Sequence, residues 1–254
     1  MPAKIVDHYT NNYLEEIRLT KDNAHRTEFL TTVRYFDKLF TPGSHILDAC
    51  AGTGVYSFYL AEKGHIVTAG DITPHHVELM QANQNAAKLA SVQVCDVLNM
   101  PQFESDSFDV VLCMGALYHL HDPADKQKAV DECVRICKPG GLVALAYVLP
   151  WASVYNELTG DLGNMEELLG WLNNQDEAVF TVSTPAEIEG YAEKCGLAKL
   201  HQVATDGPMC GMAEKLNAAT EENFQKYMQW HYSVCEEPSI LGASMHGLYV
   251  GRKA

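Results

Sequence analysis

Strand-like and helix-like segments alternate along residues 45–148, and this alternation constrains the fold more than any other feature of the sequence. Short apolar runs such as 45–49 and 107–117 predict buried strands. Between the strands lie helical segments, some of which begin at Thr-Pro or Asp-Pro and end at glycine. Two of them are predicted over 73–89, which opens at Thr-Pro, and over 122–141, which opens at Asp-Pro and stops at Pro-Gly-Gly. Strands joined through helices run parallel, and the helices cover both faces of the sheet. We therefore predict an α/β fold built on a doubly wound sheet.

The pattern changes after Pro150. Helical segments predominate there, and two further strand-like runs, 197–207 and 246–253, enclose the last of these helices. Two strands around a helical insert predict an edge hairpin with a helical lid. Because the chain shows no internal repeat, low-complexity tract or linker, we predict a single domain over all 254 residues.

The formal net charge is −15, from 18 basic and 33 acidic side chains. A negative field of this size repels nucleic-acid phosphates and anionic lipid, and the basic residues are scattered singly. No stretch approaches the ~20 apolar residues of a membrane span, and the polar N-terminus is unlike a signal peptide. We expect a soluble cytoplasmic protein, monomeric or homodimeric, that binds neither nucleic acid nor membrane.

The eight cysteines include no C-x-x-C pair, so the spacing of a zinc site is missing. Several of them lie in or beside apolar strand-like runs, where free thiols pack as small apolar side chains. We therefore expect buried free thiols and no metal.

A glycine turn with a carboxylate before it follows the first strand. The segment reads ILDACAGTGVYS, with Asp48 at the strand end and Gly52 and Gly54 in the turn. Such a turn can hold a dinucleotide, whose pyrophosphate lies at the helix N-terminus. Ser57 stands where a third glycine would pack, however, and Asp48 would repel a pyrophosphate. Asp48 would instead attract a cationic ligand such as S-adenosylmethionine. The alternative is that Asp48 only caps the turn.

Two more acidic residues end the next two strands. Asp71 follows the second strand, where a carboxylate can accept hydrogen bonds from both ribose hydroxyls of a nucleoside. Asp96 follows the third strand, where it can accept from an adenine amino group beside the backbone amide of Val97. Each aspartate alone is more often a turn residue. Together with Asp48 they occupy the carboxyl edge of the sheet, where ligands bind in open α/β folds.

The ordered motifs of residues 45–148 resemble those of class I S-adenosylmethionine-dependent methyltransferases. The segments that carry the resemblance are ILDACAGTG, VTAGDITP, VCDVLNMPQFESDSFDVVLCMGALYHL and ICKPGGLVAL. Cys50 departs from the family pattern, which often has a glycine at this point of the turn. The segments GALYHL and LGASMHGLYVGRK are similar to those of a bacterial, small-molecule type.

The resemblance implies a Rossmann-like, seven-stranded sheet of order 3-2-1-4-5-7-6, with S-adenosyl-L-methionine as cofactor. The expected parts are a helical leader at 1–40, a cofactor-binding core at 41–150, and edge strands with helical lid insertions at 151–254. The resemblance also places residues 114–116 on the far side of the cofactor. The expected cofactor-binding residues follow the first four strands: Asp48, Ala49, Cys50, Gly52, Gly54, Asp71, Ile72, Asp96, Val97, Met114 and Gly115.

Methyl transfer is a direct displacement, so the protein need supply no nucleophile, and it needs a base only for a protonated acceptor. Tyr118 and His119 follow the fourth strand, where the methyl group should point, and are the catalytic candidates. His119 is the candidate base, with a packing role in the loop as the alternative. Candidates for substrate contact come from the leader and the lid, where core packing is the alternative for the lid aromatics. They are Tyr9, Tyr13, Arg18, His25, Trp151, Tyr155 and His231.

The leading functional hypothesis is methyl transfer to a small molecule, because the chain is acidic, lacks a basic patch and has a lid. Methylation of a protein or tRNA is the second hypothesis. The charge, the absence of an appended recognition domain and the absence of an N/D-P-P-Y motif after the fourth strand argue against it. The third is a non-catalytic S-adenosylmethionine-binding regulatory module. Aspartates at three strand ends argue for binding, which does not by itself prove turnover.

Overall fold

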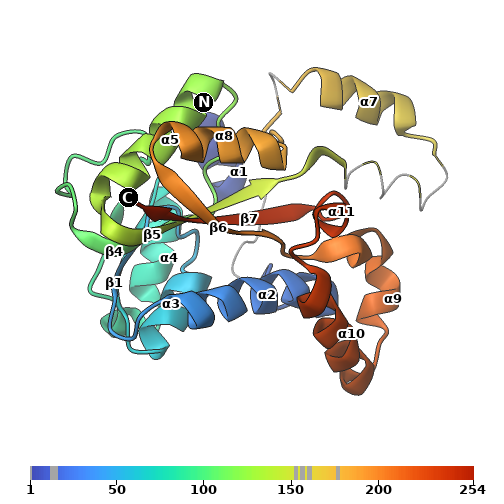
Figure 1. Ribbon diagram of the computed structural model, residues 1–254, viewed down its shortest axis with the longest axis horizontal. Coiled ribbons are helices and arrows are strands. Elements are labelled where there is room, and N and C mark those ends of the chain that lie inside the picture. Colours follow the sequence, from blue (N-terminus) through green and yellow to red (C-terminus); the bar gives the residue numbers. More distant parts are fainter. Residues whose placement is uncertain (1, 12–16, 152–153, 155–157, 159–161, 176–177) are drawn as a thin grey trace.

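A computed structural model of the chain describes residues 2–11, 17–151, 154, 158, 162–175 and 178–254. Within this part, the strands form one mixed sheet of order β3-β2-β1-β4-β5-β7-β6, which confirms the predicted order (Figure 1). The strands are β1 (His45–Asp48), β2 (Ile66–Asp71), β3 (Ser91–Val94), β4 (Phe108–Cys113), β5 (Cys137–Val148), β6 (Leu197–Ala204) and β7 (His246–Lys253).

The central strand β1 pairs in parallel with β2 on one side and β4 on the other, so Ile46 lies opposite both Val67 and Val110. The last strand, β7, instead runs antiparallel to both of its neighbours, β5 and β6. This arrangement confirms the predicted edge hairpin. It also leaves the carboxyl ends of β1 to β4 side by side at one edge.

The helices cover both faces of this sheet because successive strand residues point to opposite sides. Leu47 and Val111 belong to a buried cluster with residues of α5 (Pro123–Ile136) and α8 (Pro185–Lys194). Their neighbours Ile46 and Val110 belong to a second cluster on the other face. That cluster includes residues of α2 (Asn23–Leu39), α3 (Val55–Glu62) and α4 (Pro74–Ala82). In Figure 1, α5 and α8 lie above the sheet and α2 and α3 below it.

The remaining helices lie outside these two layers. α9 (Ala213–Asn217) and α10 (Glu221–Val234) pack on α2, and α7 (Met165–Asn173) stands apart from the layered core in Figure 1. The other described helical segments are α1 (Pro2–Asn11), α11 (Pro238–Leu241) and the short 3-10 turns η1 (Ala86–Lys88) and η2 (Gly207–Met212).

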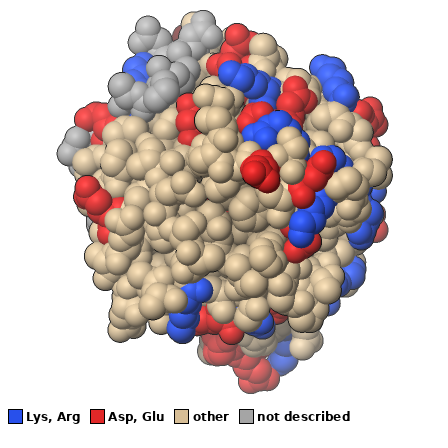
Figure 2. Space-filling model, turned by 90° about the vertical axis from the view of Figure 1, so that its left-hand side faces the viewer, with Lys and Arg blue, Asp and Glu red and all other residues tan. Residues whose placement is uncertain are grey.

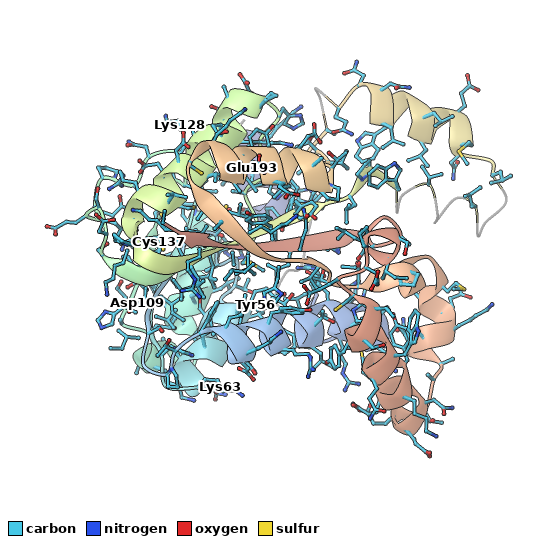
Figure 3. The ribbon with its side chains drawn as sticks, in the orientation of Figure 1. Tyr56, Lys63, Asp109, Lys128, Cys137 and Glu193 are labelled. Atoms are coloured by element: carbon cyan, nitrogen blue, oxygen red, sulfur yellow. The ribbon has the colours of Figure 1, made fainter. Side chains whose placement is uncertain are left out.

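Two helices are shorter than the sequence predicts. We expected one helix over 73–89, but α4 ends at Ala82, where the Asn83 side chain accepts the backbone N–H of Asn85 and turns the chain. We expected the helix after β4 to end at Pro-Gly-Gly, but α5 ends at Ile136 and β5 begins at Cys137 (Figure 3). Pro139 cannot continue a helix, and Gly140, at φ = 76°, bends the start of the strand instead.

The surface shows mixed charge on the face drawn in Figure 2. Lys and Arg side chains lie among Asp and Glu side chains near the margins, and a broad central area carries neither. Across the described part of the chain, no helix combines the length and apolar character that a bilayer span needs.

Candidate functional site

A cavity opens at the carboxyl edge of the sheet. Its walls come from the glycine turn after β1, from the segments that follow β2, β3 and β4, and from the N-terminal segment. Among the predicted cofactor-binding residues, Ala49, Cys50, Gly52, Asp71, Ile72, Asp96, Val97, Met114 and Gly115 line this cavity. The catalytic candidates Tyr118 and His119 and the substrate candidates Tyr9 and Arg18 line it as well.

The glycine turn has the backbone geometry that requires glycine. Gly52 and Gly54 have φ values of 55° and 89°, in the left-handed region. A Cβ on Gly54 would lie 2.8 Å from the Phe58 ring and 3.0 Å from Met80. Gly54 therefore allows α3 and α4 to approach the turn closely, although it does not itself line the cavity.

Asp48 lies beneath the turn rather than in the cavity wall. Its side chain is fully buried and accepts a hydrogen bond of 2.7 Å from the Ser57 hydroxyl at the start of α3. Burial raises the pKa of this carboxyl to about 7, and the nearby Asp71 adds to the rise. In this position Asp48 ties β1 to α3, as in the capping alternative.

Asp71 lies at the cavity wall and is fixed there by backbone donors. One carboxylate oxygen accepts the N–H of Gly52 and the other accepts the N–H of Thr73, both at 2.8 Å. Nδ1 of His76 lies 3.2 Å from the second oxygen. These contacts orient the carboxylate between the glycine turn and the start of α4.

Asp96 and Val97 follow β3 on the adjacent part of the cavity wall. The Asp96 carboxylate accepts the backbone N–H of Leu98 at 3.0 Å, which closes a tight turn. The Val97 side chain is buried. The acidic residues that end β2 and β3 thus face one cavity, as the sequence predicts for neighbouring strand ends.

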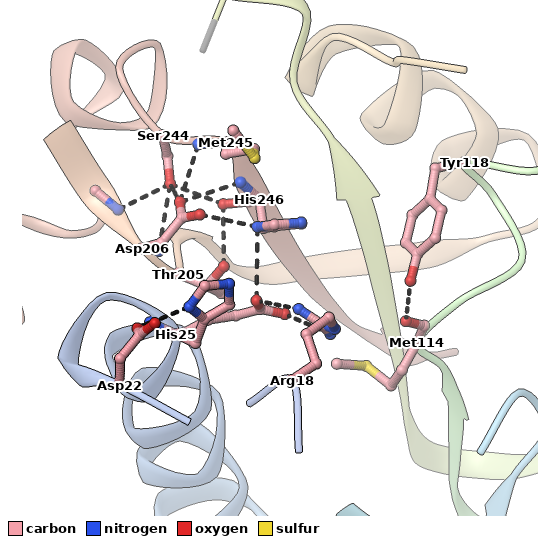
Figure 4. A network of polar contacts seen from close by, with 12 residues as sticks. Arg18, Asp22, His25, Met114, Tyr118, Thr205, Asp206, Ser244, Met245 and His246 are labelled. Atoms are coloured by element: carbon pink, nitrogen blue, oxygen red, sulfur yellow. Dashed lines mark hydrogen bonds and ion pairs between the residues drawn. The ribbon is translucent and has the colours of Figure 1, made fainter. Parts of the chain in front are cut away.

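The segment after β4 forms the opposite wall. Gly115 lies against the glycine turn, since a Cβ there would be 3.5 Å from the Cβ of Cys50. The Tyr118 hydroxyl donates to the backbone carbonyl of Met114 at 3.2 Å (Figure 4). Tyr118 therefore braces residues 114–116 from within its own loop.

His119 is buried between the cavity and the segment before α8. Its Nδ1 lies 2.9 Å from the backbone carbonyl oxygen of Val179, which can only accept, so Nδ1 carries a proton. Burial lowers the pKa of His119 to about 4, so the ring is neutral at pH 7 and Nε2 has a free electron pair. The Tyr9 hydroxyl, 2.9 Å from Nε2, donates to that pair.

Helix α1 closes over the cavity through Ile5 and Tyr9. The Tyr9 ring packs edge-on against the rings of His76 and His119, with centroids 5.2 and 5.5 Å away. His8 on the same helix packs against Phe180. The described cover of the cavity therefore comes from the N-terminal helix, and no described residue after Asp125 lines it.

Arg18 joins the cavity to a buried chain of charges. Its guanidinium makes two contacts with the Glu28 carboxylate, at 2.6 and 3.3 Å. Glu28 lies 3.6 Å from Nδ1 of His246, which pairs with Asp206 at 2.8 Å (Figure 4). The chain links the N-terminal segment, α2 and the start of β7. Its acidic members compensate Arg18, so Arg18 adds little net charge to the cavity.

Several substrate candidates lie away from the cavity. His25 pairs with Asp22 at the start of α2, and Trp151 is exposed three residues after the end of β5. His231 is fully buried in α10 against Gly207 and Tyr227. Tyr13 and Tyr155 lie outside the described residues. The residue types of His25, Trp151 and His231 do not reveal whether a side chain lines the cavity, caps a helix, packs in the core or lies on the surface.

Other lining residues were missed by the sequence reasoning, among them Ile5, Leu19, Thr53, Tyr56, His76 and Asp125. His76 had a signal, because two histidines follow the Thr-Pro that opens the helix after Asp71. Nothing in the sequence places Asp125 at the cavity, since it lies in the first turn of α5.

The cavity suits a cationic nucleoside better than a dinucleotide. Asp71, Asp96 and Asp125 contribute carboxylates to its described lining, whereas Arg18 is already paired. The Thr53 hydroxyl is buried at the turn with no hydrogen-bond partner among the described residues, so it can receive a polar group of a ligand. The described residues contain no His, Cys, Asp and Glu cluster suited to a metal ion.

Part of this chain is similar in sequence to known proteins. The family described as "Methyltransferase domain" matches residues 47–145. The ubiquinone biosynthesis O-methyltransferase of Coxiella burnetii is 29% identical over 110 residues, which cover 43% of this chain and 46% of that protein. An uncharacterised protein of Mycobacterium tuberculosis is 35% identical over 115 residues, covering 43% and 38%. The chain thus matches less than half the length of these relatives.

Solved structures resemble the whole fold. The N-methyltransferase NodS of Bradyrhizobium japonicum, in complex with S-adenosyl-L-homocysteine, has a TM-score of 0.61 at 14% identity, covering 99% of this chain and 97% of NodS. A putative methyltransferase of Haloferax volcanii, in complex with the Trm112 activator, has a TM-score of 0.63 at 18% identity, covering 98% and 97%. At these identities the likeness shows the fold alone.

The sheet order and the acidic carboxyl edge define a doubly wound, nucleotide-binding class of fold. The family of the central segment is more specific. Residues 47–145 are similar to that methyltransferase family, and the fold of the whole chain is the one that class I S-adenosylmethionine-dependent methyltransferases such as NodS have.

Proposed function

We propose that this chain transfers the methyl group of S-adenosylmethionine to a small-molecule acceptor. The observation that carries the proposal is that Asp71, Asp96 and the glycine turn line the same cavity as Tyr118 and His119. The first group suits a cationic nucleoside, and the second can bind and orient an acceptor. The Coxiella relative, named for O-methylation in ubiquinone biosynthesis, supports an acceptor of small size.

Named residues of the cavity wall fit the parts of the cofactor. Asp71 is the proposed acceptor for ribose hydroxyls, and Asp96 with Val97 is proposed to hold the adenine. Residues 49–54 and 114–116 are proposed to enclose the amino-acid portion, with Ile72 packed on the nucleoside. When bound, S-adenosylmethionine supplies an electrophilic methyl group on a sulfonium.

The remaining walls fit a small, apolar or planar acceptor. Tyr9, Tyr118, His119 and Leu120 line the cavity. Helix α1 contributes Ile5 and Tyr9 to this side, and such a cover would help to keep water away from a small acceptor. Holding an acceptor in line with the methyl group can contribute ~7–11 kcal/mol to the lowering of the barrier. His119 is the proposed base, since its Nε2 is unprotonated at pH 7.

Calorimetry with S-adenosylmethionine and S-adenosylhomocysteine tests the cofactor site. Both should bind, and Asp71→Ala should weaken binding by ~1–3 kcal/mol, the scale of a lost charged partner. Asp109→Ala is the matched control, because Asp109 also accepts a backbone N–H but lies at the opposite end of β4 (Figure 3). Absence of binding by the wild type would refute the proposal.

Methyl transfer then separates the alternatives. Labelled methyl groups should appear in small molecules of a cell extract and not in bulk RNA or protein. Label in RNA or protein would favour a macromolecular acceptor. Binding without any transfer would favour the regulatory module.

A further inference from the structure

One hydrogen bond in the cavity joins residues 110 positions apart in the chain. Tyr9, on α1, and His119, in the loop after β4, both line the cavity, and their polar atoms lie 2.9 Å apart. The direction of this bond is fixed from the far side of the imidazole. Val179 can only accept from Nδ1, so Nε2 of the neutral ring must accept from the Tyr9 hydroxyl.

We propose that Tyr9 is a catalytic residue that takes the proton of a phenolic hydroxyl acceptor and passes its own proton to His119. The proposal rests on the proposed function and deepens it by naming the acceptor group. A phenol that donates one hydrogen bond keeps lone pairs for accepting another. Tyr9 can therefore stand between an acceptor in the cavity and the buried base behind it.

The proposed step balances in atoms and charge. The acceptor oxygen forms a bond to the methyl carbon, and the carbon–sulfur bond breaks with its electron pair left on sulfur. The acceptor proton moves to the Tyr9 oxygen, and the Tyr9 proton moves to Nε2 of His119. The positive charge of the sulfonium thus ends on the imidazolium, whose Nδ1 keeps its proton and donates it in the hydrogen bond to the Val179 carbonyl oxygen.

The surroundings of His119 favour oxygen acceptors over amines. Burial lowers the pKa of His119 to about 4, so His119 cannot deprotonate an alkylammonium group with a pKa of about 10. A hydroxyl oxygen differs because its proton becomes strongly acidic as the new carbon–oxygen bond forms. A weak base that is always unprotonated at neutral pH is sufficient for that proton.

The ring contacts favour an aromatic acceptor. The rings of Tyr9 and Tyr118 each pack edge-on against His119, with centroids 5.5 and 4.8 Å away. Leu120 and Ile5 add apolar wall. Walls of this kind suit the faces and edges of a planar ring. A phenol combines that ring with the hydroxyl that Tyr9 can receive.

Tyr9→Phe in the full chain tests the proposal with two groups of phenols. Alkyl phenols keep their proton at about pH 8, whereas nitrophenols are ionised there. The wild type should methylate both groups. The variant should lose about 10²-fold in kcat on alkyl phenols. It should change by less than about threefold on nitrophenolates, which have no proton to give.

Tyr59→Phe is the matched control, because it removes a hydroxyl that bonds Asp37 on the surface outside the cavity. It should leave both rates unchanged. Equal losses on both groups of phenols, or no loss on either, would assign Tyr9 to packing and overturn the relay. Transfer to alkylamines but to no phenol would overturn the oxygen acceptor. Failure of the wild type to bind S-adenosylmethionine in calorimetry would instead refute the proposed function itself.

Discussion

At the scale of single residues, His119 shows how a neighbour decides a chemical role. The Val179 carbonyl fixes the proton on Nδ1, and burial keeps the ring neutral. A histidine of ordinary pKa, about 6.5, would be partly charged near neutrality. Cys50 stands where related sequences often have glycine. The turn still forms around Gly52 and Gly54, and Cys50 lines the cavity.

His119→Ala should lower kcat by about 10²–10⁴-fold while S-adenosylmethionine affinity stays within a few fold, because only the base is removed. Single-turnover assays and calorimetry measure the two effects. His121→Ala is the control, since His121 lies two residues away and does not line the cavity. Unchanged turnover in His119→Ala would exclude His119 from the mechanism.

The pH profile of the wild type checks the same residue. The lowered pKa favours the neutral base, so the base form is lost only as the pH falls through about 4. Between pH 6 and 8, kcat should show no titration from this group. A fall in kcat centred near pH 6.5 would contradict the buried, neutral state.

At the scale of elements, the glycine turn connects β1 to α3 and sets how closely two helices approach it. Gly54 and Gly140 both have left-handed φ values, 89° and 76°. A Cβ on Gly54 meets Phe58 and Met80, whereas one on Gly140 meets no atom within 4 Å. The same backbone requirement therefore has different packing consequences at the two positions.

Gly54→Ala should cost more unfolding free energy than Gly140→Ala. Both variants pay ~1–2 kcal/mol for a side chain in the left-handed region. Overpacking against Phe58 and Met80 should add a further ~1–3 kcal/mol at Gly54 alone. Urea denaturation of the two variants measures the difference. Equal losses would mean that α3 and α4 adjust without cost.

At the scale of the whole molecule, a charged chain holds the N-terminal segment against the sheet. Arg18, Glu28, His246 and Asp206 come from four separate parts of the sequence (Figure 4). Burial alone would lower the pKa of His246, but the carboxylates of Glu28 and Asp206 outweigh it and raise that pKa. Burial alone would likewise raise the pKa of both carboxyls, but their cationic partners hold each below its ordinary value.

Stability should therefore depend on pH through His246. A raised pKa in the folded state stabilises the fold fully below the unfolded value of about 6.5, and the gain is lost as the pH rises through the folded pKa. The lowered carboxyl pKa values stabilise the fold above about pH 4.5, and that gain is lost toward acid. The network should thus contribute most between about pH 4.5 and 6.5.

Thermal unfolding checks this window. The Tm of the wild type should fall between pH 6 and pH 9 by more than the Tm of His246→Gln, which lacks the titrating ring. Parallel curves for the two proteins would show that His246 does not stay charged in the fold.

The fold was predictable where local patterns agree with the sheet. Apolar strands at 45–49 and 107–117, with helix signals between them, gave the parallel core, and the resemblance supplied the strand order. The helix predicted over 73–89 was wrong at its end, because a single asparagine side chain outweighs a helical pattern. The start of β5 was missed because Pro-Gly-Gly is typical of a helix stop and of a bent strand alike.

The candidate site likewise contains residues that the sequence predicts and residues that it does not. Asp71 and Asp96 were predictable, because the carboxyl ends of neighbouring parallel strands share one edge of the sheet. Ligands bind at that edge, so acidic residues there are expected to line one cavity. Asp48 occupies the same kind of position in sequence but lies beneath the turn, because Ser57 offers it a buried hydrogen bond. Asp48 also pairs with Ala69, two residues before Asp71, so the two carboxylates lie at different levels along the sheet, and residue types do not reveal this offset.

The sequence by itself determined the layered α/β sheet, the glycine turn and the acidic edge, since each depends on short-range periodicity and on residues within a few positions of a strand end. Only the tertiary structure decided that Tyr9 reaches His119, that Arg18 reaches Glu28 and His246, and that Trp151 and His231 lie elsewhere. Those contacts join distant segments through side-chain packing, and many sequences with the same local pattern could pack a leader helix differently.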